Sequence, residues 1–199
     1  MRKRLLCASL SRWFLFPEAK RRRAIATDGT MTELTLTIRP EHPGDHATID
    51  RLHARAFGPG RFARTAFRLR EGVDHDLSLS FAAHVGTLLV GSVRLSPVWA
   101  GNVPALVLGP LTVEPAFKER GIGGALMRHA LEEARSRGEQ LVLLVGDAAY
   151  YRRFGFAPVP PGRFTLPGPV DPARLLVCPL VTDSSDTARG EVRPRLDDR

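Results

Sequence analysis

The segment from Leu106 to Gly138 constrains the fold more than any other part of the chain. It opens with a short run of aliphatic and β-branched residues, which predicts a buried strand over 106–113. Gly109 and Pro110 interrupt this run. Because proline cannot donate a ladder hydrogen bond, we expect a β-bulge at that pair. Apolar residues then recur three and four positions apart, which predicts a helix that begins near Ile122 and stops at Gly138.

Three glycines lie at the start of this predicted helix, at positions 121, 123 and 124. Each costs about 1 kcal/mol relative to alanine within a helix, so a compensating role is expected. Without side chains, a ligand can approach the unpaired first-turn amides at the positive end of the helix dipole, where a phosphate or pyrophosphate fits. Lys118 and Arg120 place positive charge beside them. The alternative is a tight loop in which glycine only supplies a positive φ.

Two motifs together resemble those of the GNAT superfamily of acyl-CoA-dependent N-acetyltransferases. The loop 118–123 reads K-E-R-G-I-G and is similar to the pyrophosphate loop Q/R-x-x-G-x-G/A of that family, with lysine in the first place. Residues 151–156 read Y-R-R-F-G-F and are similar to its Y-x-x-x-G-F segment. The resemblance covers about residues 32–181 and looks most like the stand-alone bacterial branch called YhbS-like.

The resemblance implies a mixed α/β (α+β) fold, in which helices flank a twisted, mostly antiparallel sheet with one splayed parallel strand pair. The residues themselves predict the following further elements: strands near 34–38, 79–85, 87–98 and 174–181, a helix capped by Asp45, and a second helix near 61–70. Residues 140–145 form a continuous apolar run, typical of a strand buried on both faces. It follows a strand-helix unit, so it is expected to lie parallel to 106–113.

The resemblance also implies where acetyl-CoA, the acyl donor, would bind. Its pantetheine arm is expected in the opening between the two parallel strands. The residues assigned to the cofactor are Leu111, Thr112 and Val113 along the acyl-pantetheine, and Lys118, Glu119, Arg120, Gly121, Ile122, Gly123 and Gly124 around the pyrophosphate. Tyr151 falls where the family places a tyrosine near the cofactor sulfur, whereas Tyr150 is expected to pack. The chain departs from the family at Gly146-Asp147, where many members carry an asparagine, so the contact to the pantetheine amide stays open.

The implied reaction is acetyl transfer to a primary amine by direct attack on the thioester. With a reference pKa of about 10, against about 8.5 for a thiol, Tyr151 can stay protonated and act as the acid toward the departing sulfur. Amides near Leu111 could serve the oxyanion. Glu114 and His84 are candidates for a base that acts through water, although a structural role is commoner for each. The alternative function is a non-catalytic, regulatory acyl-CoA-binding module that keeps the loop and lacks turnover.

Cysteine content and charge argue against several other classes. Cys7 and Cys178 offer neither metal-ligand spacing nor a disulfide framework, so no metal and a cytoplasmic location are expected. No apolar stretch approaches the roughly 18 residues that cross a bilayer. The net charge is +8, but residues 1–30 contribute eight Lys and Arg against two acidic residues. Residues 31–199 therefore lack the strong excess of positive charge that is typical of proteins that bind polyanions.

The expected partner is a small-molecule or peptide amine, with no nucleic acid and no membrane, and a homodimer is one expected assembly. RNA or membrane association through the basic leader stays open as a rival. Four arginines, Arg61, Arg64, Arg68 and Arg70, lie on the second predicted helix, where a solvated face is favoured over contact with an acidic substrate.

Three regions are expected along the chain of 199 residues. Residues 31–181 form the N-acetyltransferase domain, which is large enough for a sizeable core. Residues 1–30 are expected to be a basic extension, disordered or absent from a native protein that starts at Met31. Residues 182–199 are polar and charged and are expected to be a disordered tail.

Overall fold

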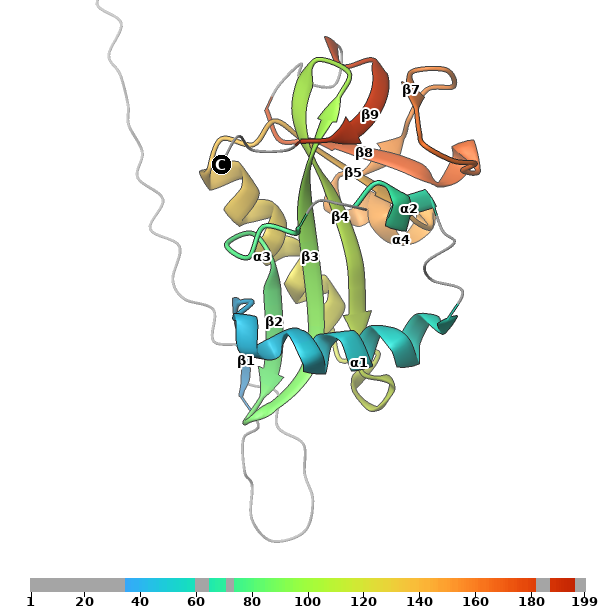
Figure 1. Cartoon of the computed structure of the whole chain (residues 1–199). Helices are drawn as coiled ribbons and strands as arrows, with labels where there is room; N and C mark the ends of the chain where they lie inside the picture. Colours follow the sequence, from blue (N-terminus) through green and yellow to red (C-terminus); the bar gives the residue numbers. More distant parts are fainter. Residues whose placement is uncertain (1–34, 60–64, 71–73, 182–186, 196–199) are drawn as a thin grey trace, which may run out of the picture. The chain divides into compact units, whose positions relative to one another are not determined.

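The structure is a computed structural model that describes residues 35–59, 65–70, 74–181 and 187–195. Its main sheet has the strand order β1-β2-β3-β4-β5-β8-β6, with β9 beside β3 and β7 beside β9 (Figure 1). The strand bounds are β1 Leu36–Pro40, β2 Phe81–Val85, β3 Leu88–Ala100, β4 Val103–Val113, β5 Leu141–Val145, β6 Ala157–Pro158, β7 Phe164–Thr165, β8 Leu175–Pro179 and β9 Gly190–Pro194. The strands predicted from the sequence are therefore present, with shifted ends.

The centre of the sheet opens between β4 and β5, its parallel neighbours. They pair at Leu106↔Val142 and Val107↔Leu143. Beyond that point β4 runs on to Val113, while β5 ends at Val145, and no further pairing joins them. The splayed parallel pair implied by the family resemblance is thus confirmed, and the neighbours β3 and β8 are antiparallel to β4 and β5.

The predicted bulge is also confirmed. Val93 of β3 faces Leu111 of β4, and Leu95 faces Leu108, so one residue of β3 spans Gly109 and Pro110. An extra residue bends the bulged strand and increases its local twist. The bulge lies just past the last pairing of β4 with β5, so it contributes to the separation of the two strands.

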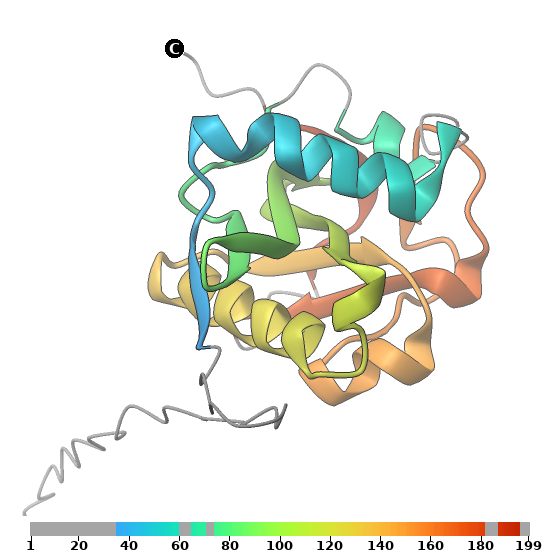
Figure 2. The ribbon, with the colours of Figure 1, turned by 90° about the horizontal axis from the view of Figure 1, so that it is seen from below.

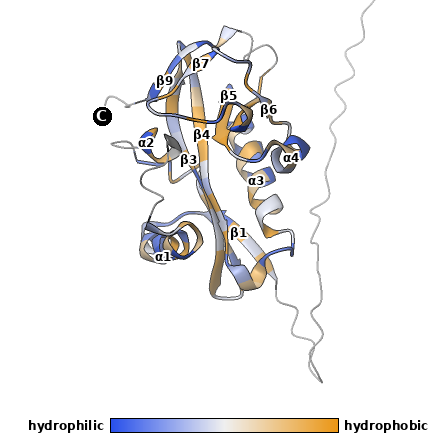
Figure 3. Cartoon of the chain, turned by 90° about the vertical axis from the view of Figure 1, so that its right-hand side faces the viewer, coloured by the Kyte–Doolittle hydropathy of each residue, from blue (hydrophilic) through white to orange (hydrophobic). Residues whose placement is uncertain are grey.

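Two helices cover opposite faces of the sheet, α1 (His46–Phe57) and α3 (Ile122–Ser136) (Figures 2 and 3). The inner face of α3 carries Leu126 and Met127, both fully buried. Each such side chain stabilises the fold by about 1.5–3 kcal/mol. The stripe predicted from apolar spacing is therefore the face that packs on the sheet, and its neighbours there include Phe81 and Val93.

The start of α1 differs from the prediction. Asp45 occupies the N-cap position but its side chain makes no capping bond to α1. Its carboxylate instead accepts from the His42 amide (2.9 Å) and from Arg39, closing the short 3-10 helix η1 (Pro43–Asp45). Competition from the Arg39 guanidinium, which comes from β1, explains the difference, because charge-assisted hydrogen bonds are stronger than neutral ones.

The predicted second helix is shorter than expected. Within the described residues it is one turn, α2 (Thr65–Arg68). The helices between β5 and β6 are also short, α4 (Ala148–Tyr151) followed by the 3-10 helix η4 (Arg152–Phe154). No helix among the described residues is long and apolar enough to cross a bilayer.

The prediction of a disordered tail over 182–199 is wrong for residues 187–195. There β9 pairs with residues 98–100 of β3, and Val192 is 1% exposed. Polar composition hid this strand because only alternate side chains of an edge strand need be apolar. The predicted extension 1–30 and the first residues of the predicted domain, 31–34, lie outside the described residues.

Candidate functional site

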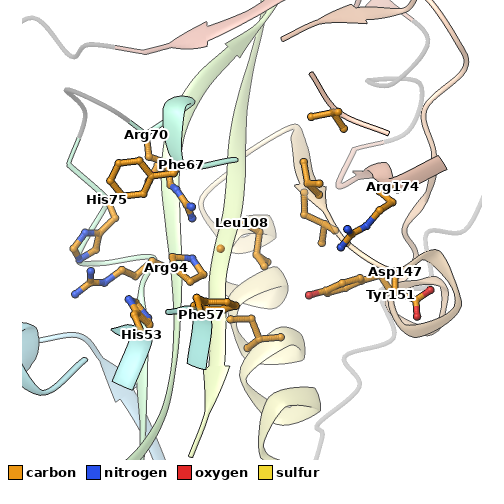
Figure 4. Close-up of a pocket in the computed structure, with 18 of the residues that line it drawn as sticks. His53, Phe57, Phe67, Arg70, His75, Arg94, Leu108, Asp147, Tyr151 and Arg174 are labelled. Carbon is orange, nitrogen blue, oxygen red and sulfur yellow. The ribbon is translucent and has the colours of Figure 1, made fainter. Parts of the chain in front are cut away.

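A cleft of about 1170 Å³ lies where β4 and β5 separate (Figure 4). One wall is formed by the end of β5, α4 and the 3-10 helix η5 (Pro172–Arg174), and the other by α1, α2 and β3. The bulge residues of β4 form the floor between them, with Leu108 and Leu111 on either side. A cleft that opens beyond the carboxyl end of a parallel strand is a common place for ligand binding.

Tyr151 stands on the first wall, and its hydroxyl points into the cleft (Figure 4). Its ring lies against the backbone of Gly146, where an added Cβ would be 2.8 Å from Cδ2 and closer still to Cε2. Asp147 caps α4 by accepting from the Ala149 amide (2.9 Å), which fixes the turn that carries the tyrosine. Gly146 and Asp147, the departure from the family pattern, are thus the residues that position Tyr151.

Burial raises the pKa of Tyr151 to about 12, with smaller contributions of the same sign from Tyr150 and Asp147. Arg174 acts in the opposite direction. The balance keeps the phenol protonated throughout the neutral range. The cleft therefore holds a permanent O–H donor on this wall.

Tyr150 packs against neighbouring residues, as predicted, and it lies between the cleft and the start of α3. Its hydroxyl lies 3.2 Å from the position that a Cβ on Gly123 would take. The Arg153 guanidinium covers its ring at 4.1 Å. Since Tyr150 also lines the cleft, this side chain connects the cleft to the start of α3.

The loop before α3 presents unpaired backbone amides. Glu119 has a φ of 62° and Gly121 a φ of 81°, so two left-handed residues turn the chain tightly here. The first intrahelical bond runs from the Ala125 amide to the Gly121 carbonyl (3.0 Å), which leaves the three preceding amides without an intrahelical acceptor. The positive φ supports the tight-loop interpretation at Gly121, and it is compatible with the predicted phosphate site because such turns also orient amides toward an anion.

The other residues assigned from the sequence lie along β4 and the loop. Leu111 lines the cleft, whereas Thr112 and Val113 do not. Thr112 is buried, and its Oγ1 has no hydrogen-bond partner among the described residues. Lys118, Glu119 and Arg120 are exposed beside the start of α3.

The two candidate bases lie outside the cleft. Glu114 pairs with Arg55 of α1 (2.9 Å), and Nε2 of His84 lies 3.3 Å from Arg39. Neither residue lines the cleft. The described residues contain no group of three or more side chains that could hold a metal ion.

The second wall holds a polar cluster that sequence reasoning missed. Arg94 of β3 donates to both carboxylate oxygens of Glu41 (2.6 and 2.9 Å), and His75 Nε2 lies 3.1 Å from the same carboxylate. At the rim, Asp50 lies 3.4 Å from Arg94 and 3.3 Å from His46. Apart from His46 and Asp50, which both lie on α1, these residues come from separate elements, so no spacing in the sequence could have grouped the cluster.

His53 and Arg70 complete this wall (Figure 4). His53 is 5% exposed, its Nε2 lies 3.1 Å from Ser92 Oγ, and burial lowers its pKa to about 4. The expectation of a solvated face is wrong for Arg70, which is partly buried and lines the cleft, while Arg68 is exposed as expected. The turn after Arg68 explains the difference, because it ends the helical register and redirects Arg70. Arg61 and Arg64 lie outside the described residues.

Comparisons with known proteins agree with this geometry. The sequence profile of the Acetyltransferase (GNAT) family matches residues 38–156. The chain is 32% identical over 132 residues to the uncharacterized N-acetyltransferase YjhQ of Escherichia coli K12, covering 64% of this chain and 73% of that protein. It is 31% identical over 129 residues to YhbS of the same organism, also an uncharacterized N-acetyltransferase, covering 61% and 73%.

Solved structures are similar as well. The crystal structure of E. coli YhbS in complex with CoA has a TM-score of 0.70 at 27% identity, covering 86% of this chain and 94% of that one. A GNAT family acetyltransferase from Brucella melitensis in complex with acetyl-CoA has a TM-score of 0.60 at 28% identity, covering 81% and 97%. Both similarities extend over nearly the whole length of the solved proteins.

Proposed function

Because the chain belongs to the acetyltransferase (GNAT) family, we propose that it transfers the acetyl group of acetyl-CoA to a primary amine by direct attack on the thioester. The observation that carries this proposal is the cleft between the diverging strands, with the Tyr151 hydroxyl on one wall. Similar proteins with bound CoA and acetyl-CoA support the choice of donor. The amine is expected to be a small molecule or a peptide.

The loop before α3 would hold the pyrophosphate. The amides from Glu119 to Gly124, which have no hydrogen-bond partner among the described residues, sit at the positive end of the α3 dipole, and the side chains of Lys118 and Arg120 add two positive charges beside them. The pantetheine arm would then extend along Leu111, Thr112 and Val113 of β4 into the cleft. Tyr150, which reaches both Gly123 and the cleft, lies on the path between the two sites.

In the proposed reaction the amine nitrogen bonds to the thioester carbon and the carbon–sulfur bond breaks. One proton leaves the amine, and one proton ends on the departing thiol. A tyrosine of pKa about 12 does not give up its proton completely to a thiolate of pKa about 8.5. Its role is therefore to donate a hydrogen bond to the sulfur as negative charge develops there.

Acetyl-CoA binding by the full chain tests the donor site. Calorimetric titration of wild-type protein should be saturable. Replacing Lys118 and Arg120 together by glutamate should weaken the affinity at least tenfold, because each change puts a negative charge beside the phosphates.

The matched control replaces Arg189 and Arg193 by glutamate. Both are exposed near β9 and give the same change in net charge. This variant should bind as the wild type does. Equal loss of acetyl-CoA affinity in the two variants would mean that net charge alone causes it and would count against the loop as the phosphate site. Absence of saturable binding to the wild type would refute the proposed donor.

A further inference from the structure

The two arginines on the second wall of the cleft differ in how their charges are balanced. Arg94 is paired with Glu41, whose side chain is fully buried. Burial by itself would raise the pKa of Glu41, but hydrogen bonds from His75 and Arg94 outweigh it and lower the pKa to about 2. The carboxylate is therefore ionised at neutral pH and cancels the Arg94 charge within the wall.

Arg70 has no such partner. Its guanidinium forms no ion pair with any carboxylate of the described part of the chain, although it is partly buried and lines the cleft. Burial, and then the positive charge of Arg94, lower its pKa to about 10. A cation removed from water is unfavourable unless a negative charge meets it.

The Arg70 side chain lies over the bulge at the floor of the cleft. Its Nη1 is 3.3 Å from the position that a Cβ on Gly109 would take, so the absence of a side chain there leaves room for the guanidinium. Leu111, two residues further along β4, lies on the same floor. Two residues of extended chain span about 7 Å.

We infer that Arg70 binds a carboxylate group of the amine substrate, so that the acetyl acceptor is an amino acid or a short peptide with its amine several bonds from that carboxylate. This inference rests on the proposed function, because it places the amine at the thioester beside Leu111. A guanidinium presents a planar fork that matches a carboxylate. Of the two arginines on this wall, Arg70 alone lacks a carboxylate partner among the described residues, and the acidic Asp50 and Asp74 also line the cleft, which favours a singly charged group over a phosphate.

Paired substrates test the inference in the full chain with saturating acetyl-CoA, with thiol release as the readout. The probes are β-alanine, 4-aminobutyrate and 6-aminohexanoate, each compared with its own amide. At one chain length or more, kcat/KM for the acid should exceed that for the amide at least tenfold. Arg70→Gln should abolish this preference by lowering kcat/KM for the acid toward the value for its amide.

Arg68→Gln is the matched control, because Arg68 is exposed two positions away and should not alter the preference. Equal kcat/KM for every acid and its amide would overturn the inference while turnover itself upholds acetyl transfer. A preference for the acid that survives Arg70→Gln would overturn it too. So would an Arg70-dependent preference for O-phosphoethanolamine over all three acids.

A binding measurement separates this inference from the proposed function. Titration of 4-acetamidobutyrate and of its amide into the full chain with CoA present does not require turnover. Binding of the acid that Arg70→Gln weakens at least tenfold, without thiol release from any amine, would support the carboxylate site and count against acetyl transfer. If neither thiol release nor Arg70-dependent binding is observed, both the carboxylate site and the proposed acetyl transfer are refuted.

Discussion

Tyr151 and Tyr150 are adjacent in the chain but have different surroundings. The Tyr151 hydroxyl points into the cleft (Figure 4). The Tyr150 hydroxyl instead lies against Gly123 at the start of α3. Their rings meet edge to face, with centroids 4.9 Å apart. Substitutions of the two hydroxyls should therefore have different consequences.

Tyr151→Phe should lower kcat for acetyl transfer by about 100-fold, the lower end of what a positioned hydrogen-bond donor to a developing negative charge supplies. The affinity for acetyl-CoA, measured by calorimetry, should change little, because the ring and its packing on Gly146 remain. Tyr150→Phe is the control and should keep kcat within a few-fold of the wild type. A similar kcat for wild type and Tyr151→Phe would exclude the proposed role of this hydroxyl.

The same hydroxyl sets an expectation for the pH profile. Since burial raises the pKa of Tyr151 to about 12, kcat should not fall between pH 7 and pH 10 through ionisation of this residue. Thiol release across that range with wild-type protein measures it. A decline near pH 9 that Tyr151→Phe removes would contradict the assignment.

His53 should make the stability of the protein depend on pH. Burial lowers its pKa from 6.5 to about 4, so between these values the unfolded chain binds more protons than the folded one. The contribution of neutral His53 is complete above pH 6.5 and is lost as pH falls toward 4. About 2 kcal/mol of the free energy of unfolding should be lost between pH 7.5 and pH 5.

Urea unfolding of the wild type and of His53→Gln at these two pH values checks this. Glutamine can still reach Ser92 but does not titrate, so the variant should show a smaller pH dependence even if it is less stable overall. His84, whose pKa burial also lowers, contributes in the same direction in both proteins. Equal pH dependence in the two proteins would be inconsistent with a neutral buried His53.

At the level of elements, the junction between β5 and α4 positions the tyrosine. Gly146 ends the strand region, donates its amide to the Arg174 carbonyl (2.9 Å) and leaves no space for a side chain beside the Tyr151 ring. Asp147 then starts the four-residue helix α4. Such a short helix can fix the orientation of Tyr151 because Asp147 caps its start and the Arg152 amide donates to the Ala148 carbonyl at its end.

Gly146→Ala should destabilise the protein by about 1–3 kcal/mol, because the new methyl group collides with the Tyr151 ring. The same substitution in a Tyr151→Ala background should cost clearly less, since the principal clash is removed. Urea unfolding of the four proteins gives the coupling energy. Additive effects would show that Gly146 does not position Tyr151.

At the level of the whole molecule, the C-terminal segment is part of the sheet. Val192 of β9 and the nearby Ala188 are buried and join a cluster with Val98 and Ala100 of β3. Strand β9 in turn pairs with β7, which lies in the Pro- and Gly-rich stretch after β6. The boundary of the folded unit therefore lies beyond residue 181.

Val192→Ala should lower the free energy of unfolding by about 2 kcal/mol, the value for two buried methyl equivalents, with any cavity adding to it. Val181→Ala makes the same chemical change at a side chain that is 50% exposed, and should stay within about 0.5 kcal/mol of the wild type. Both are measured by urea unfolding. Equal, small effects would mean that residues 187–195 do not contribute to the folded unit.

Sequence patterns were sufficient to predict the parts of the protein that depend on local chemistry. Apolar spacing determined the buried face of α3, the Gly109-Pro110 pair determined the bulge, and the two motifs indicated the family, because each signal lies within one short segment. For the same reason, only those residues of the candidate site that lie within such a short segment could be predicted. Tyr151 and the loop 118–124 were predicted because they belong to those motifs.

The side chains that line the cleft opposite Tyr151 follow from the packing of distant segments and from no local pattern. Glu41, His75 and Arg94 are brought together by β1, the loop before β2, and β3, and Arg70 is turned inward by the end of α2. Their separation in the chain leaves no periodic signal, and a lone arginine in a sequence does not reveal whether a carboxylate will meet it. The reason is physical: burial and charge balance depend on which segments pack together, and that is fixed only when the sheet assembles.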